Sequence, residues 1–375
     1  MMIKDSMYTQ SEIAGGVSPR CSLRSDNPPA GRAGMSDLYF VFLSCPRRFP
    51  VRGALSALGF EKGDMILKFK LKFTIMLKTL FVVFLNYTSV ALSLPEEKDF
   101  HSYWYNYGAE ISRFELEQSR YGEIHSGHVV LIFVTEPFLP DIQVKSDFES
   151  SREKSIPILK LNLIKRFDTG IYDYSMMKSV FTPIPSGQHQ FSKTLKVSTT
   201  RQDWCGHVFL QYNLDGDCYK VKQYSYFEKE GDKTVNIPSV HLEDDIWTRI
   251  RIDPKTLPLG GIEMIPGSFF TTLRMIDLRV EKAVAELTNM QEGDRGDVSQ
   301  YTVKYPSLGR TLSIRFNRNF PHDILSWSET CPSGPGKGAK VLTTKARRTH
   351  AVMVDYWNKK SVKDLKLRKE LGLIK

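Results

Sequence analysis

The sequence predicts a mainly β protein of the α+β class, built as a curved antiparallel sheet or barrel-like sandwich with a few short helices. Short runs in which apolar and polar residues alternate recur from residue 109 to residue 330, and turn residues separate them. Hydrophobic residues make up 41% and charged residues 25% of the 375 residues, as in ordinary globular proteins. Aromatic residues concentrate in 197–226, where the hairpin signal is clearest.

The N-terminal region divides at Met76. Residues 76–93 contain a lysine, the apolar run Leu80–Leu85 and then small residues, which is the pattern of a secretory signal peptide. The apolar run is too short to span a membrane. Residues 1–75 are then a disordered or spurious N-terminal extension, with Met76 as the true start. We therefore expect an exported protein of the periplasm or outer-envelope surface, with no transmembrane helix in its mature form.

The net charge of +10 is concentrated at the two ends of the chain. Residues 1–75 carry 11 basic against 6 acidic residues, and residues 337–375 carry 12 against 3. The body between them is mildly acidic. A nucleic-acid-binding domain would concentrate basic charge on its folded body, so we expect no nucleic-acid partner.

We expect a single β-rich domain at 94–350, which opens with a short amphipathic helix at 95–107 that docks on a sheet. The expected strands are 109–121, 128–136, 158–167, 172–181, 191–199, 279–287, 300–305, 311–316 and 322–330.

Two further helices are expected. One runs from Leu242 to Ile252 and ends before Asp253-Pro254. Its acidic opening, Glu243 to Asp245, is interpreted as interacting with the helix dipole and not as a metal site. The second helix, Val362–Leu371, lies in a basic C-terminal segment at 351–375.

The segment 197–226 is expected to form the central hairpin, with its turn at Asp215-Gly216. This register places Cys218 opposite Asn213 and leaves Cys205 roughly 26 Å away along the hairpin. A disulfide requires Cα atoms within about 7 Å. The hairpin therefore predicts that Cys205 and Cys218 are not bridged to each other.

The same hairpin supplies the candidate site residues. The run Trp-Cys-Gly-His at 204–207 opens like a thioredoxin-type motif, but Val208 occupies the place of the second cysteine, which excludes that redox chemistry. A cysteine–histidine pair with a nearby carboxylate would suit a hydrolase. The candidates for catalysis are Cys205, His207 and Asp203, with Glu228 as an alternative carboxylate, and the candidates for ligand binding are Trp204, Tyr212 and Tyr226.

A His-x-x-His spacing at His125 and His128 offers a zinc pair beside Glu123. Strong zinc sites show three or four spaced ligands, and a hairpin tip with Ser126-Gly127 explains the run more simply. We therefore expect no metal and no cofactor.

Two stretches resemble known families. Residues 40–60 resemble the opening of Maf-type nucleotide pyrophosphatases, the septum formation inhibitor family. The matching residues are Ser44, Pro46, Arg47 and Arg48. That resemblance implies phosphate capture by paired arginines at a helix N-terminus.

The body at 103–357 resembles an uncharacterised family of secreted or envelope proteins from Gram-negative bacteria, some of which carry the Maf label. The resemblance lies in Tyr103-Trp104-Tyr105, in 116–123, in 204–207 and in Phe320-Pro321-His322. The family has no assigned chemistry, so it implies no catalytic residue.

The leading hypothesis is an exported, non-enzymatic envelope protein whose curved sheet covers or binds an apolar or polymeric ligand. The signal-like segment, the aromatic strands and the lack of a convergent acid and base favour it. The alternatives are an extracytoplasmic hydrolase and a Maf-like nucleotide pyrophosphatase.

Overall fold

In the computed structural model, residues 97–185, 192–291 and 297–374 are described. The predicted N-terminal extension, signal peptide and Maf-like stretch lie outside these residues.

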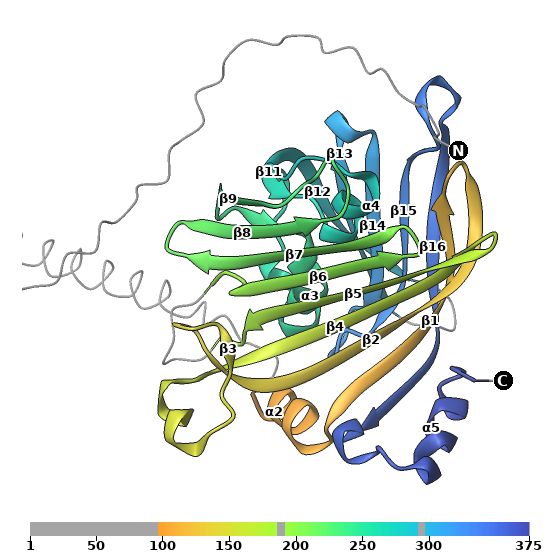
Figure 1. Cartoon of the computed structure of the whole chain (residues 1–375). Coiled ribbons are helices and arrows are strands. Elements are labelled where there is room, and N and C mark those ends of the chain that lie inside the picture. Colours follow the sequence, from red (N-terminus) through yellow and green to blue (C-terminus); the bar gives the residue numbers. More distant parts are fainter. Residues whose placement is uncertain (1–96, 186–191, 292–296, 375) are drawn as a thin grey trace, which may run out of the picture. The chain divides into compact units, whose positions relative to one another are not determined.

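The described residues form one sheet of 16 strands with a few short helices (Figure 1). The strands are β1 (Ala109–Arg120), β2 (Glu123–Leu139), β3 (Val144–Lys145), β4 (Ile156–Thr169), β5 (Tyr172–Pro183), β6 (Lys196–Asp203), β7 (Gly206–Asp215), β8 (Cys218–Ser225), β9 (Lys233–Pro238), β10 (His241–Leu242), β11 (Gly260–Ile265), β12 (Glu281–Gln291), β13 (Asp297–Tyr305), β14 (Arg310–Asn317), β15 (Ile324–Ser333) and β16 (Lys340–Val354). The α-helices are α2 (Glu97–Asn106), α3 (Ile246–Ile252), α4 (Ser268–Arg274) and α5 (Leu365–Glu370). The prediction of a mainly β, curved antiparallel sheet is confirmed.

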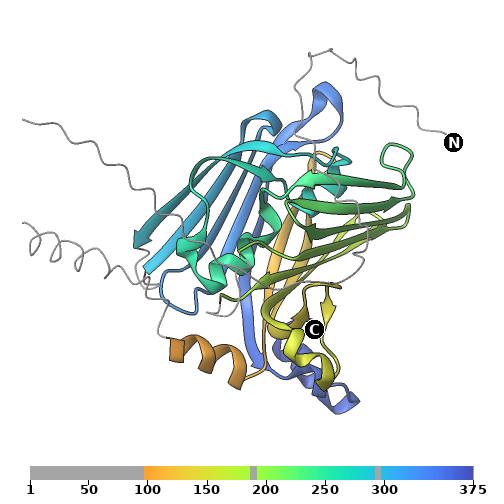
Figure 2. The same ribbon diagram turned by 90° about the vertical axis from the view of Figure 1, so that its left-hand side faces the viewer.

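The chain enters the sheet in its middle. Strands β1 to β9 run outward to one edge, and β11 to β16 return from the other edge until β16 pairs with β1. Every pairing is antiparallel except that of β10 with β11. The sheet bends around α3 and α4. Figure 2 shows these helices between the strands β1 to β9 and the strands β11 to β16.

The inner face of the sheet holds the main hydrophobic core. In β14 buried and partly exposed residues alternate strictly, as a half-buried strand requires. Helix α3 packs Trp247 against Trp327 of β15, with ring centroids 5.0 Å apart, and Trp327 in turn lies 4.8 Å from Phe114 of β1. Helix α2 docks through Trp104, which is 1% exposed, and this confirms the expected N-terminal helix.

The register of the central hairpin differs from the expected one. Asp215 pairs with Cys218, so the turn is Gly216-Asp217 and not Asp215-Gly216. Gly216 has a φ of 57°, which glycine adopts without steric penalty, and it therefore occupies the first turn position. The prediction about the cysteines is nevertheless confirmed, because Cys205 is a free thiol.

Strand β16 was missed by the sequence analysis, and the expected domain boundary at residue 350 falls inside it. Its inward positions include the polar Thr344 and the small Ala346, so the apolar alternation that marks a strand is weak. Within the expected basic helix Val362–Leu371, the structure has a short turn at Val362–Asp364 followed by α5. Beyond α5, Leu371 packs against Ile111 and Val130.

Candidate functional site

The acidic run that precedes α3 binds three cations inside the sheet. Glu243 accepts two hydrogen bonds from the Arg310 guanidinium at 2.5 and 2.6 Å. Asp244 pairs with Lys178 and also accepts the backbone N–H of Ser268 at 3.0 Å.

The third member of the run, Asp245, lies 3.0 Å from Arg249 Nε and accepts a hydrogen bond from Thr194 at 2.8 Å. The helix-dipole interpretation missed these three ion pairs. Two of them tie the acidic run to strands of both halves of the sheet, Arg310 in β14 and Lys178 in β5, and the third joins Asp245 to Arg249 of α3.

A second buried ion pair lies nearby. Arg251 of α3 donates to both carboxylate oxygens of Glu110 at 2.5 and 2.6 Å, and Tyr103 donates to the same carboxylate. Burial alone would raise the pKa of Glu110, but the Arg251 guanidinium outweighs it and holds that pKa below its ordinary value. The inner face is therefore occupied by helices, core side chains and satisfied charges.

A hollow of about 750 Å³ lies beside β11, lined by His241, Asp245, Arg249 and neighbouring residues. Asp245 is already bound there by Arg249 and Thr194. One of the two lining carboxylates, Asp245, is therefore satisfied within the protein, and the other is Glu263.

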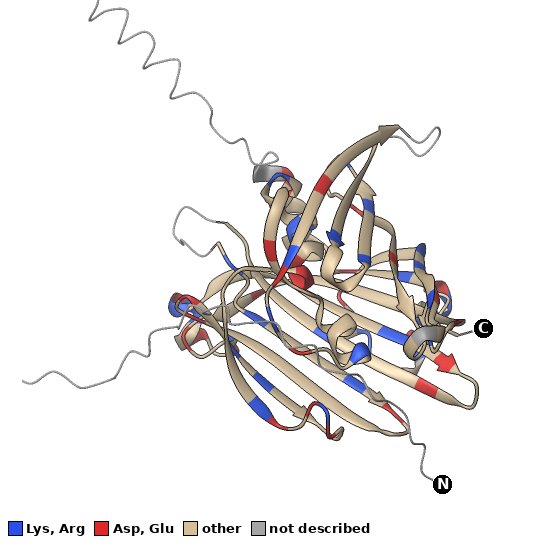
Figure 3. Cartoon of the chain, turned by 90° about the horizontal axis from the view of Figure 1, so that it is seen from above, with Lys and Arg blue, Asp and Glu red and all other residues tan. Residues whose placement is uncertain are grey.

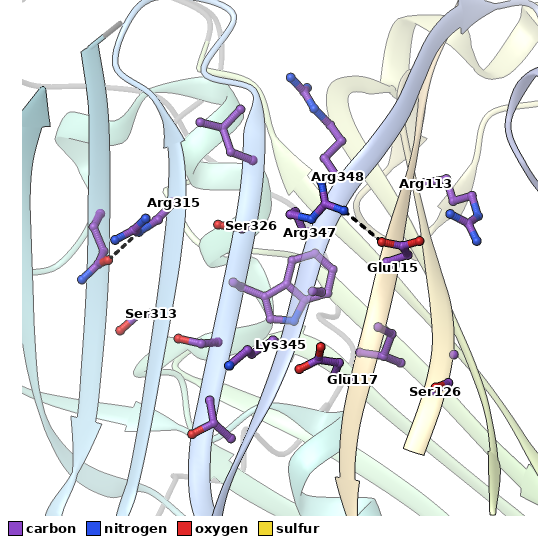
Figure 4. A pocket seen from close by; sticks show the side chains of 18 residues that line it. Arg113, Glu115, Glu117, Ser126, Ser313, Arg315, Ser326, Lys345, Arg347 and Arg348 are labelled. Atoms are coloured by element: carbon purple, nitrogen blue, oxygen red, sulfur yellow. Dashed lines mark hydrogen bonds and ion pairs between the residues drawn. The ribbon is translucent and has the colours of Figure 1, made fainter. Parts of the chain in front are cut away.

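The larger hollow is a groove on the outer face of β1, β2 and β13 to β16, with a volume of about 1140 Å³ (Figure 4). Two β-bulges border it. The pairing of β16 with β1 skips Thr349, and the pairing of β15 with β14 skips Leu325. Because a bulge bends its strand and increases the local twist, these bulges account for the hollow in an otherwise regular surface.

The groove is cationic and rich in hydroxyl groups. Five basic and two acidic residues line it. Arg348 lies opposite the buried Phe114 and pairs with Asp323, so four basic and two acidic side chains remain on the outer face, a net charge of +2 at neutral pH. The groove's basic residues are Arg113, Arg315, Lys345, Arg347 and Arg348, its acidic residues are Glu115 and Glu117, and its hydroxyl residues are Ser126, Ser313, Ser326, Ser328 and Thr343.

Several groove side chains hold one another in place (Figure 4). Arg347 Nη2 lies 3.0 Å from Glu115, and both side chains are largely exposed, at 69% and 59%. Arg315 donates to Gln300 at 3.0 Å. Lys345 faces Glu117 directly across β16 and β1, so opposite charges meet on neighbouring strands. Figure 3 shows basic and acidic positions interspersed on the strands.

The groove belongs to a polar row that crosses ten strands of the outer face. Each residue of the row is the direct cross-strand partner of the next, from β13 at one end to β7 at the other, and none of them is apolar. The row consists of Gln300, Arg315, Ser326, Arg347, Glu115, His128, Arg166, Ser175, Gln202 and His207. At ~4.8 Å between strands, nine spacings make a track of roughly 43 Å along the curved surface.

Two histidines proposed from the sequence, His128 and His207, lie in this row. Burial lowers the pKa of His128, and the nearby Arg113 and Arg166 lower it further, so this ring is neutral at pH 7.

The candidate catalytic group does not form an activated nucleophile. Cys205 lies in the two-residue turn between β6 and β7, and its backbone N–H donates to Asp203 at 2.8 Å. Burial and the Asp203 carboxylate raise the pKa of the Cys205 thiol, which works against the reactive thiolate. In the described part of the chain no hydrogen bond joins this thiol to His207 or to Glu228.

The two histidines proposed as a zinc pair do not share a face. Residues three apart in a strand point to opposite sides, and His125 binds the backbone oxygen of Arg120 at 3.1 Å while His128 faces outward. Across residues 97–185, 192–291 and 297–374, no group of three or more His, Cys, Asp or Glu residues is placed to hold a metal ion.

The three residues proposed for binding separate into two environments. Trp204 is 68% and Tyr226 75% exposed. Trp204 lies in the β6–β7 turn, whereas Tyr226 follows β8 and lies beside the start of β7. Gly206 permits this approach, because a Cβ there would lie 2.7 Å from the Tyr226 ring. Tyr212, in contrast, is a core residue with 1% exposure, so it is not available to a surface ligand.

Sequence reasoning missed the basic groove, whose side chains come from segments more than 200 residues apart. Only the charged alternation of Lys345 and Arg347 in β16 could have indicated an outward-facing basic strand.

Comparisons with family models, with curated proteins and with solved structures found no match for this chain. None of the helices in the described ranges has the length and apolar character needed to cross a membrane.

Proposed function

We propose that this chain is an exported, non-enzymatic envelope protein that binds an anionic polymer, an acidic polysaccharide, along the groove on its outer face. The observation that carries the proposal is the groove itself, in which the basic side chains of Arg113, Arg315, Lys345 and Arg347 lie among hydroxyl groups. Basic side chains attract carboxylate or sulfate groups, and serine and threonine hydroxyls both donate to and accept from sugar hydroxyls.

The length of the polar row favours a polymer over a small anion. The row continues from the groove past β2 as far as β7, and Arg166 adds a further cation in β4. A small anion would use one cluster of charges, whereas a chain can contact a repeat of cations and hydroxyls across the strands.

The inner face argues against the apolar ligand considered from the sequence. Helices α3 and α4 lie there, and the buried pairs Arg310–Glu243 and Arg251–Glu110 place charges among the core side chains. An apolar ligand on that face would have to displace satisfied ion pairs, which is unfavourable.

An acidic polysaccharide fits the groove better than a nucleic acid does. Glu115 and Glu117 act against phosphates and against sugar carboxylates alike, so these two charges do not distinguish the polymers. Single-stranded nucleic acids also use exposed aromatic rings for stacking, whereas the groove's indole, Trp327, is 6% exposed.

The test is isothermal titration of the full-length chain with polygalacturonate, with dextran as the neutral polymer and single-stranded DNA as the competing polyanion. We expect polygalacturonate to bind with an affinity that falls as salt rises, because counterions screen the basic side chains. The double variant Arg315→Ala/Lys345→Ala should bind about tenfold more weakly, since two lost contacts of ~0.7 kcal/mol each correspond to that factor.

The matched control is Lys220→Ala/Lys222→Ala, which removes two exposed lysines from β8, outside the groove. Equal weakening by both double variants would show that overall charge and not the groove binds the polymer. Binding of DNA as tight as that of polygalacturonate would show that the ligand class is wrong.

Export is tested separately by mass spectrometry of the mature N-terminus after expression in a Gram-negative host. We expect the mature chain to begin near residue 94, after the signal-like segment. An intact N-terminus at Met1 in the cytoplasmic fraction would contradict export.

A further inference from the structure

Three hairpins meet at one end of the sheet and form an aromatic corner, which we define as Arg120, Tyr121, Tyr172, Asp173, Tyr174 and Trp204. The β1–β2 turn contributes Tyr121, the start of β5 contributes Tyr172 to Tyr174, and the β6–β7 turn contributes Trp204. The β1–β2 and β4–β5 hairpins emerge on the same side of the molecule in Figure 1. The corner is remote in sequence from the groove's strands β13 to β16.

Two of the corner's rings are exposed yet held in place, while Tyr172 is half-buried and Tyr174 is buried. Trp204 is 68% and Tyr121 49% exposed. The indole Nε1 of Trp204 donates to Asp173 at 3.1 Å, and the Tyr172 ring lies 6.5 Å from the Trp204 ring at an angle of 42°. Two rings fixed at an angle on the surface of a protein form a preorganised platform, which is unusual for aromatic side chains without a partner.

A cluster of hydroxyl groups lies next to this platform. Tyr121 and Tyr174 share a hydrogen bond of 2.7 Å, and Tyr172 donates to Tyr121 at 3.0 Å. Arg120 donates to both Tyr121 and Tyr174 at 3.2 Å. Its Nε is buried without a hydrogen-bond partner in the described part of the chain.

The β1–β2 turn fixes Tyr121 at the corner. Its φ is 54° and that of Gly122 is 81°, both in the left-handed region. A two-residue hairpin turn between Arg120 and Glu123 requires positive φ at both positions. This tight turn carries the tyrosine whose hydroxyl joins the other two.

Two carboxylates face each other beside the rings. Asp168 and Asp173 are direct cross-strand partners in β4 and β5. Like charges in this arrangement are mutually destabilising. Neither forms an ion pair with any residue in the described ranges, so both retain acceptor capacity for a ligand's hydroxyl groups.

We propose that the aromatic corner is a second binding site, for a neutral pyranose ring of a glycan. A pyranose ring presents an apolar C–H face, which suits the angled pair Tyr172 and Trp204, and hydroxyl edges, which suit the tyrosine hydroxyls. Asp173 points to the other side of β5 from Tyr172 and positions Trp204 through its indole N–H. The carboxylates disfavour an anionic sugar and an anionic lipid surface, because both would be repelled by Asp168 and Asp173. The site is independent of the groove and does not rest on the function proposed for it.

The test titrates the full-length chain with cellohexaose, laminarihexaose and N-acetylchitohexaose in buffer that contains a metal chelator. We expect at least one of these neutral hexasaccharides to bind, and Trp204→Ala and Asp173→Asn each to weaken it at least tenfold. The matched control is Trp357→Ala, which removes an indole that is 46% exposed outside the corner. Unchanged melting temperatures would establish that the variants fold.

Three results would overturn the proposal: no hexasaccharide binds, Trp204→Ala binds as well as the parent chain, or Trp357→Ala weakens binding equally. Binding of phosphatidylglycerol vesicles that depends on Trp204, without sugar binding, would show that the corner contacts membranes instead. The groove variant Arg315→Ala/Lys345→Ala should keep hexasaccharide binding while it loses polygalacturonate. The two proposals can therefore fail separately.

Discussion

Replacing Glu243 by glutamine should destabilise the fold strongly. Arg310 is 3% and Glu243 5% exposed, so both charges are shielded from water, and Glu243 receives two of the hydrogen bonds from Arg310. Removing one partner of a buried ion pair typically costs about 3–5 kcal/mol, because the remaining charge is left uncompensated. Glu329 still accepts from Arg310 Nε at 2.6 Å, so we expect the lower end, about 3 kcal/mol. That is a large share of the 5–15 kcal/mol that usually stabilises a fold.

The measurement is urea unfolding of the parent chain and of Glu243→Gln, monitored by tryptophan fluorescence. The control is Glu115→Gln, which neutralises the partner of Arg347 in a pair that is 59% and 69% exposed. Exposed pairs of this kind contribute about 0–1 kcal/mol, so the control should unfold almost as the parent does. A loss below 1 kcal/mol for Glu243→Gln, or equal losses for both variants, would refute the conclusion that the acidic run holds α3 in the sheet.

Three further predictions concern the same interior. Gly267→Ala should lower the free energy of unfolding measured in urea, because a Cβ at this position would lie 2.3 Å from the Glu243 carboxylate oxygen. Burial lowers the pKa of Lys165 from 10.5 to about 8. Below pH 8 this lysine is charged in both the folded and the unfolded protein, so burying its charge fully destabilises the fold. Between pH 8 and 10.5 only the unfolded state keeps the proton, and the stability of the parent relative to Lys165→Met should rise by up to about 3 kcal/mol, measured by urea unfolding at pH 7 and 10. Burial alone would raise the pKa of Glu110 and of Glu329, but their arginine partners outweigh burial and lower each pKa below 4.5. The two ion pairs should therefore stop stabilising the fold as the pH falls below that value, and the melting temperature should fall with it.

Each of these predictions has a contradicting result. Gly261→Ala is the control for Gly267→Ala, since a Cβ at residue 261 meets nothing within 4 Å, and equal effects would contradict the proposed clash. A difference between the parent and Lys165→Met that stays constant from pH 7 to 10 would show that Lys165 keeps its ordinary pKa. A melting temperature that is flat between pH 5 and pH 3 would contradict the carboxylate prediction.

Most individual elements could be predicted from the sequence because their signals are local. The alternation in β14 follows from side chains that point to opposite faces at successive residues, and the same rule identified β1, β4 and β5. The α3 helix was expected to end before Asp253-Pro254, as the structure has it, because proline disfavours helical backbone at the preceding residue.

The candidate site was predicted much less completely, since it depends on contacts between distant segments. His128 and His207 were noticed as single residues, but the row that joins them requires the pairing of the three intervening strands β4, β5 and β6. The turn was expected at Asp215-Gly216, which made Asn213 the expected partner of Cys218, whereas the structure pairs Cys218 with Asp215.

The sequence by itself therefore determined the alternation that makes strands, the helix that follows the acidic run, and the separation of Cys205 from Cys218. Only the tertiary structure decided that β16 pairs with β1, that Glu243 binds Arg310, and that the groove lies where two bulges meet. The physical reason is that the local alternation of apolar and polar residues determines which face of the sheet a side chain occupies. Its neighbours on that face are set by strand order and register, which depend on the whole chain.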